Sequence, residues 1–130
     1  MESGGCFCGA VRYELSSGTV HVALCHCSDC RRSAGAPMVG WAAVPRTELS
    51  VEGELTTFQS SELAQRQFCP KCGTGLFYIN ETVLPGLVDV QIGTLDDPET
   101  LVPQAHIQVA ERLNWVEGMN ALPTFERYPA

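Results

Sequence analysis

The chain has 130 residues, 45% of them hydrophobic, and a formal net charge of −7. This length fits one compact domain over residues 1–130, and the hydrophobic content excludes a disordered, charge-rich chain. The acidic balance argues against nucleic acid as the main partner, because phosphate binding needs clustered lysine and arginine.

Short β-rich runs separated by glycine, proline, serine and aspartate dominate the chain, and no long segment has the period of an amphipathic helix. Residues 28–33 are predicted to form a short helix capped by Ser28, and residues 96–99 the cap and first turn of another. The layout therefore predicts a mainly β domain with minor helices. The strands are predicted over residues 10–15, 20–25, 38–44, 49–51, 55–59, 66–69, 74–79, 87–93, 106–109 and 124–127.

Cysteine is the most informative residue type in the chain. An odd number of cysteines cannot pair completely into disulfides within one chain. The interrupted apolar stretches fit no membrane span and the first residues show no secretory signal, so we expect a reducing, cytoplasmic compartment. Cysteines in such a compartment act as metal ligands or nucleophiles. The seven fall into three groups, Cys6-x-Cys8, Cys25-x-Cys27-x-x-Cys30 and Cys69-x-x-Cys72.

Grouped thiolates are typical of zinc sites, where residues close in sequence converge on one ion with a distant pair. The run 69–73, Cys-Pro-Lys-Cys-Gly, predicts a zinc knuckle with both sulfurs pointing inward. Seven ligands divide into four, which close a structural site, and three, which leave a position open for water or substrate. Spacing allows the knuckle to join either Cys6 and Cys8 or Cys27 and Cys30. The first pairing keeps each local cluster intact and is preferred.

Half of the basic residues lie beside the cysteine groups. Positive charge near thiolates compensates their charge and lowers the thiol pKa. Ordinary surface solvation is an equally good interpretation for any one of them. They are Arg31, Arg32, Arg66 and Lys71.

Three ordered motifs surround the cysteine groups. They are Gly4-Gly5-Cys6-Phe7-Cys8-Gly9-Ala10-Val11-Arg12-Tyr13, Cys25-His26-Cys27-Ser28-Asp29-Cys30-Arg31-Arg32 and Phe68-Cys69-Pro70-Lys71-Cys72-Gly73-Thr74. These motifs resemble those of the glutathione-dependent formaldehyde-activating enzyme family, and centromere protein V belongs to the same wider family. The segment 94–98 is also similar, and the resemblance covers nearly the whole chain.

The resemblance implies a β-tent (Mss-four-like) fold, with small antiparallel sheets around a structural zinc. It also implies a carbon–sulfur lyase that joins formaldehyde to glutathione as S-hydroxymethylglutathione, so the expected partners are a small thiol such as glutathione and a small aldehyde. The resemblance assigns the sulfurs to two sites. The structural zinc takes Cys6, Cys8, Cys69 and Cys72, and a second, catalytic zinc takes Cys25, Cys27 and Cys30.

Zinc held by three thiolates can act in two ways. A thiol entering its open position loses a proton and becomes nucleophilic, or the ion polarises the aldehyde oxygen as a Lewis acid. Three soft thiolates weaken Lewis acidity, which favours thiol activation. The alternative function is a non-catalytic zinc-binding, interaction or redox module on the same fold.

Other side chains near the motifs are expected to have structural roles. We predict that His26 points away from the Cys25 and Cys27 side and supports the loop. Asp29 is predicted to cap the loop, and His106 to be a structural histidine. Four aromatic residues are candidates for a pocket wall, although most of them are expected to fill the core. They are Trp41, Phe58, Phe77 and Trp115.

Overall fold

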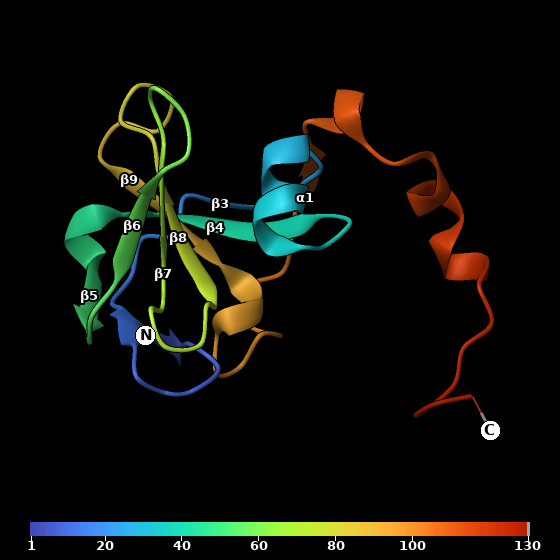
Figure 1. Cartoon of the computed structure of the whole chain (residues 1–130), viewed down its shortest axis with the longest axis horizontal. Helices are drawn as coiled ribbons and strands as arrows, with labels where there is room; N and C mark the ends of the chain where they lie inside the picture. Colours follow the sequence, from blue (N-terminus) through green and yellow to red (C-terminus); the bar gives the residue numbers. More distant parts are fainter. Residues whose placement is uncertain (130) are drawn as a thin grey trace.

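The computed structural model describes residues 1–129 (Figure 1). Ten strands form two sheets, which confirms the expected mainly β class. The smaller sheet is antiparallel and has the order β1-β2-β5. Its strands are β1 (Glu2–Gly5), β2 (Arg12–Leu15) and β5 (Leu49–Glu52).

The larger sheet has seven strands in the order β10-β3-β4-β9-β8-β7-β6. Its pairs are antiparallel except β10 with β3, which run parallel. This sheet is larger than the small antiparallel sheets expected. Its strands are β3 (His21–Cys25), β4 (Val39–Pro45), β6 (Thr56–Gln59), β7 (Gln65–Phe68), β8 (Gly75–Ile79), β9 (Leu87–Gln91) and β10 (Ala105–Ile107).

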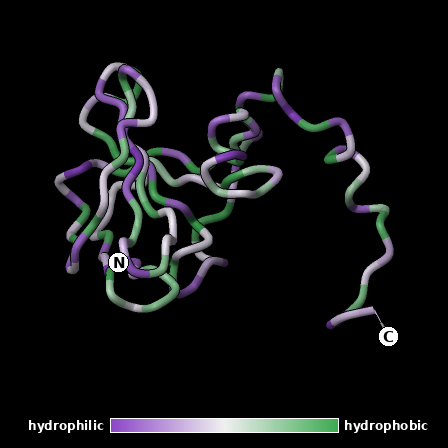
Figure 2. Tube along the Cα trace, in the orientation of Figure 1, coloured by the Kyte–Doolittle hydropathy of each residue, from purple (hydrophilic) through white to green (hydrophobic). Residues whose placement is uncertain are grey.

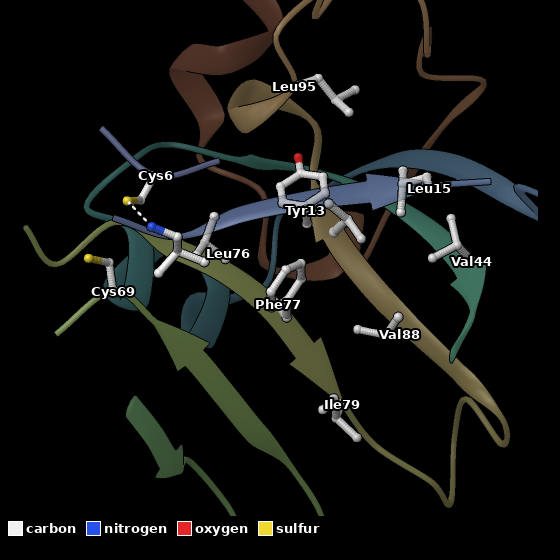
Figure 3. Close-up of a cluster of buried hydrophobic side chains, with 12 residues drawn as sticks. Cys6, Tyr13, Leu15, Val44, Cys69, Leu76, Phe77, Ile79, Val88 and Leu95 are labelled. Carbon is white, nitrogen blue, oxygen red and sulfur yellow. Dashed lines mark hydrogen bonds between the residues drawn. The ribbon is translucent and has the colours of Figure 1, made fainter. Parts of the chain in front are cut away.

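The core lies between the two sheets and follows the alternation of their strands. On β2, Tyr13 and Leu15 are buried while Arg12 and Glu14 are exposed. The Tyr13 ring meets Phe77 of β8 edge to face, with centroids 5.4 Å apart. Figure 3 shows Val44 and Val88 in the same cluster, and two cysteine sulfurs at its end. The core therefore continues directly into a sulfur cluster.

The predicted helix after the middle cysteines is present as α1 (Ser28–Ala34), but its cap is not Ser28. The N-cap is Cys27, whose Sγ accepts a hydrogen bond from the Cys30 amide at 3.3 Å. Gly35 ends the helix with a φ of 66°, a left-handed conformation that glycine adopts without strain. The cap thus places Cys27 beside Cys30.

Two further predictions are wrong. Residues 96–99 form a turn rather than a helix, because the Asp97 carboxylate accepts the amide of Glu99 and closes the chain locally. Residues 124–127 form no strand, since they lie in a C-terminal segment that runs away from both sheets (Figure 1). Short 3-10 helices supply the remaining helical turns, at Arg46–Glu48, Ile92–Thr94, Val109–Glu111 and Asn114–Ala121.

The segment that follows β10 passes α1 and then runs away from the two sheets (Figure 1). Figure 2 shows hydrophobic and hydrophilic residues interspersed along it. Trp115 lies there and is 57% exposed, so it does not belong to the core. Within residues 1–129, no helix has the length and apolar character needed to span a bilayer.

Candidate metal centre

Four cysteines from two distant loops meet at one end of the core. Cys6 and Cys8 lie in the loop that follows β1, and Cys69 and Cys72 in the turn between β7 and β8. Their Sγ atoms all lie within 4.8 Å of one another. We call this set the four-cysteine cluster. It joins the small sheet to the large one at the end of the core shown in Figure 3.

The turn between β7 and β8 aims both of its sulfurs at the cluster. The Gly73 amide donates to the Cys69 carbonyl at 2.9 Å, and the Cys69 amide donates to the Thr74 carbonyl at 3.0 Å. Gly73 has a φ of 80°, a conformation in which a side chain would be strained. The local sequence therefore requires glycine where the chain reverses.

The sulfur spacing fits one tetrahedral zinc ion. The Sγ atoms of Cys6 and Cys8 are 3.6 Å apart, and those of Cys8 and Cys69 are 3.8 Å apart. A tetrahedron of thiolates with bonds of about 2.3 Å has edges of about 3.8 Å. A disulfide needs about 2.05 Å, and all seven cysteines are free. The four-cysteine cluster thus matches the donor set and spacing of a structural zinc site.

Surrounding groups stabilise negative charge on these sulfurs. Backbone amides of Val11 and Lys71 donate to the Sγ atoms of Cys6 and Cys69, at 3.2 and 3.4 Å. The Thr74 hydroxyl lies 3.1 Å from the Cys72 Sγ, and this contact, followed by backbone hydrogen bonds from Thr74 and Cys8, lowers the pKa of the Cys72 thiol to about 5. Such contacts orient the ligands of a metal site, and those at Cys6 and Cys72 favour the thiolate form.

The remaining cysteines form a second group, the three-cysteine cluster. Cys25 ends β3, Cys27 caps α1 and Cys30 lies in the first turn of α1. Their Sγ atoms also lie within 4.8 Å of one another. Within residues 1–129, no histidine or carboxylate joins them as a fourth ligand. Three sulfurs at this spacing suit a metal ion that keeps one position open.

Hydrogen bonds among the three cysteines favour a negative charge on one of their sulfurs. Cys25 and Cys30 are buried, and Cys27 is partly exposed. The hydrogen bond from Cys25, followed by those from Cys27 and Arg66, lowers the pKa of the Cys30 thiol to about 5. The same bond to Cys30, together with burial, raises the pKa of Cys25. One thiolate is therefore already favoured at neutral pH, as metal binding requires.

A cavity of about 330 Å³ adjoins the three-cysteine cluster. Trp41 and Arg66 line it and also contact the cluster, Trp41 by packing and Arg66 through Nη2 at 3.8 Å from the Cys30 Sγ. Of the aromatic residues expected at a pocket, Phe58 and Phe77 line it as well. Trp41 and Phe77 are buried and Phe58 is exposed, so the cavity lies at the edge of the packed sheet.

His26 is fully buried, and its Nε2 lies 2.8 Å from Nδ1 of His106. This contact agrees with the expected supporting roles of both residues. Asp29 is exposed, and its side chain makes no hydrogen bond to another described residue. Instead, the Glu111 carboxylate accepts the Ser28 amide at 3.0 Å and occupies the loop-capping position expected of Asp29.

Two polar residues beside the cluster were not found from the sequence. Asp89 of β9 is buried, and burial raises the pKa of its carboxyl to about 6. Gln91, on the same face of β9, lines the cavity. Residues 88–92 alternate between apolar and polar side chains, but only the sheet order places the polar face beside the cysteines.

A family model described as glutathione-dependent formaldehyde-activating enzyme matches residues 1–111. A Schizosaccharomyces pombe protein named an uncharacterized lyase is 28% identical over 75 residues, which are 58% of this chain and 55% of that protein. A Halomonas elongata protein provisionally named a glutathione-dependent formaldehyde-activating enzyme is 29% identical over 129 residues, covering 90% of this chain and 80% of that protein. The chain thus spans about half the length of the yeast relative.

Two further similarities concern a fungal relative and a solved structure. A Phaeosphaeria nodorum protein with the same provisional name is 33% identical over 106 residues, covering 76% of this chain and 56% of that protein. The crystal structure of a Rhodobacter sphaeroides protein is similar with a TM-score of 0.63 and 28% identity, covering 80% of this chain and 98% of that chain. The fold is therefore shared with a solved structure.

Proposed function

Because the chain belongs to the glutathione-dependent formaldehyde-activating enzyme family, we propose that it is a zinc-dependent carbon–sulfur lyase acting at the three-cysteine cluster. The reaction forms or cleaves a thiol–aldehyde adduct of the S-hydroxymethylglutathione type. The substrates are a small thiol such as glutathione and a small aldehyde such as formaldehyde. The observation that carries the proposal is the convergence of Cys25, Cys27 and Cys30, without a fourth protein ligand in residues 1–129.

In this proposal one cluster has a structural role and the other a catalytic role. The four-cysteine cluster holds a structural zinc that ties the sheets together at the core, where Cys6 and Cys69 are buried. The three-cysteine cluster holds the second zinc through Cys25, Cys27 and Cys30. When bound there, zinc supplies an open ligand position at which a thiol loses its proton more readily and becomes nucleophilic.

The reaction itself needs no redox partner. In the synthetic direction a carbon–sulfur bond forms between the thiol sulfur and the aldehyde carbon, and the carbonyl double bond becomes a single bond. The proton lost by the thiol ends on the new hydroxyl oxygen. In this step the chain binds and orients the thiol beside Trp41 and Arg66, which line the cavity next to the cluster.

The decisive experiment follows the exchange between free and adducted glutathione in a mixture with formaldehyde, by exchange NMR. Zinc-loaded protein is expected to accelerate the exchange above the spontaneous rate, and Cys27→Ala to abolish the acceleration. Val102→Ala, at an exposed site away from the cluster, is the control and should retain the wild-type rate. An exchange no faster than the spontaneous one, and unchanged in Cys27→Ala, would refute this function.

One observation favours the alternative of a non-catalytic redox or interaction module. The pKa of the Cys30 thiol is lowered to about 5 by Cys25 and its other neighbours, and the adjacent Cys27 is partly exposed. A low pKa and access to solvent are the properties of an oxidisable thiol group. Under this alternative the protein retains one zinc, and Cys25, Cys27 and Cys30 are modified readily by oxidants. Two tightly held zinc ions support the lyase instead.

A further inference from the structure

Arg66 stands on the face of the large sheet that carries the three-cysteine cluster. The strand register pairs it with Phe58 of β6 on one side and with Tyr78 of β8 on the other, and pairs Tyr78 with Asp89 of β9. Directly paired residues share one face, so these four side chains form a row across the sheet. The guanidinium lies over the Tyr78 ring, 4.8 Å from its centroid.

No carboxylate of the described residues accepts a hydrogen bond from the Arg66 guanidinium. Its Nε is buried and has no hydrogen-bond partner among the described residues. The salt bridges found in residues 1–129 involve Arg12, Arg46 and Arg112, and none involves Arg66. Asp89 belongs to the same row, but Tyr78 stands between them, and the Asp89 Oδ1 also lacks a partner. Arg66 therefore presents a positive charge that contacts the Cys30 thiol and is paired with no carboxylate of the described chain.

This charge faces the cavity of about 330 Å³. Among the described residues that line the cavity, Arg66 is the only charged one, and Trp41, Phe58 and Phe77 make much of the wall apolar. A charge beside apolar walls interacts more strongly with a ligand than one in open water. The wall offers one positive charge, so it suits a singly charged carboxylate better than a phosphate with two charges.

Arg66 also links this cavity to the reacting centre. Its Nη2 points to the Cys30 Sγ at 3.8 Å, while its unused Nε lies on the same planar group. A guanidinium carries five donors in a fixed fork and can serve a sulfur and a carboxylate together. Arg66 therefore borders both the cavity and Cys30, and a ligand that extends from the cavity toward the cluster has its anionic group within reach of the guanidinium.

We propose that Arg66 binds a carboxylate of the thiol substrate, so that the site selects thiols that carry a carboxylate. The inference rests on the proposed function, because it assumes that a thiol is the ligand beside Cys30. It assigns Arg66 a role in specificity in addition to compensation of the thiolate charge.

The test measures binding rather than turnover, by calorimetry on the zinc-loaded protein without aldehyde. The two probes are 3-mercaptopropionate and its methyl ester, which differ in the carboxylate. Wild-type protein is expected to bind the acid about tenfold more tightly than the ester, since a charge-assisted hydrogen bond contributes on that scale. Arg66→Gln should bring the two affinities together, and Arg66→Lys should keep part of the preference. Arg46→Gln, at an exposed arginine paired with Glu81, is the matched control and should keep all of it.

Three results would overturn the inference. Wild-type protein could bind acid and ester equally, or bind neither, or Arg66→Gln could weaken both probes by the same factor with its zinc content intact. The last result would mean that Arg66 only compensates the thiolates. A preference for the acid in a protein that does not accelerate adduct exchange would support the role of Arg66 and refute the lyase. Acceleration of adduct exchange without any preference for the acid would support the lyase and refute the role of Arg66.

Discussion

Nε2 of His26 lies 2.8 Å from Nδ1 of His106, although 80 residues separate them in sequence. The two rings are tilted by 38° with centroids 5.0 Å apart. The parallel pairing of β10 with β3 brings them together, and the His26 amide donates to the Ile107 carbonyl at 3.1 Å. Since His26 stands between Cys25 and Cys27, the β10 strand holds the loop that carries the three-cysteine cluster.

His106→Ala is therefore expected to weaken the fold and the second metal site together. The substitution leaves the buried His26 ring without a partner at either nitrogen, because its Nδ1 already has none in residues 1–129. An orphaned buried polar group costs about 1–3 kcal/mol. Denaturant unfolding measures that loss, and competition with a chelator measures zinc affinity. Val102→Ala, exposed in the preceding segment, is the control. An unchanged unfolding free energy in His106→Ala would show that β10 does not hold the loop.

The two cysteine clusters should respond differently to the loss of one sulfur. Cys69 is fully buried and belongs to both the core and the four-cysteine cluster. A structural zinc contributes about 10–16 kcal/mol of binding free energy, as much as or more than a typical domain's entire stability. We expect the circular dichroism spectrum of Cys69→Ala to be that of an unfolded chain. Cys27→Ala should stay folded and lose about 1 kcal/mol from the helix cap. A folded Cys69→Ala protein of wild-type stability would refute the structural role of the four-cysteine cluster.

Gly4→Ala is expected to disturb the smaller sheet. A Cβ at Gly4 would overlap the Tyr13 hydroxyl and the Thr94 carbonyl oxygen, and Tyr13 is buried at the centre of the core. Overpacking of this kind typically costs about 1–3 kcal/mol. Gly118→Ala is the matched control, because its new methyl group would meet no atom within 4 Å. Thermal unfolding of both variants checks the prediction, which is wrong if Gly4→Ala unfolds at the same midpoint temperature as the wild type.

Asp89→Asn should stabilise the protein at neutral and alkaline pH. Burial raises the pKa of the Asp89 carboxyl from 3.8 to about 6. The interaction with His21 lowers this pKa in part, and that with Cys30 raises it by a smaller amount. The folded chain therefore holds this proton more tightly than the unfolded chain. The cost of ionising Asp89 grows as pH rises from about 4 to 6 and is constant above, on the order of 2–3 kcal/mol.

The amide removes that cost, so the advantage of Asp89→Asn should be full at pH 8 and about half as large at pH 5. Urea unfolding of both proteins at the two pH values measures the difference. A variant less stable than wild type at pH 8, or an advantage independent of pH, would contradict a buried ionised Asp89.

The cysteine grouping was predictable, whereas the contacts around it were not. Ligand pairs two or three residues apart must lie together, and the family resemblance assigned the distant pairs to each other, so the clusters have the expected members. Their roles as zinc ligands stay predictions. The contacts of Arg66 with Cys30 and of His26 with His106 depend on which strands are neighbours, and that order is set by the whole sheet.

Local strand signals predicted nine of the strands, β2 to β10, and missed β1. Residues 11–15 alternate, and 12–15 of them form β2, which packs Tyr13 and Leu15 into the core. β1 has the sequence Glu-Ser-Gly-Gly, with little strand propensity, and forms because its backbone pairs with β2. Residues 124–127 show the opposite case, since a suitable composition has no partner strand in the described part of the chain.

The central claim is that four sulfurs hold a structural zinc and three hold a second one. Mass spectrometry under native conditions, on zinc-loaded wild type and Cys27→Ala, tests it most directly by counting ions. The account predicts two zinc ions in the wild type and one in Cys27→Ala, with both proteins folded. A wild type that holds one zinc, or a Cys27→Ala protein that still holds two, would contradict it.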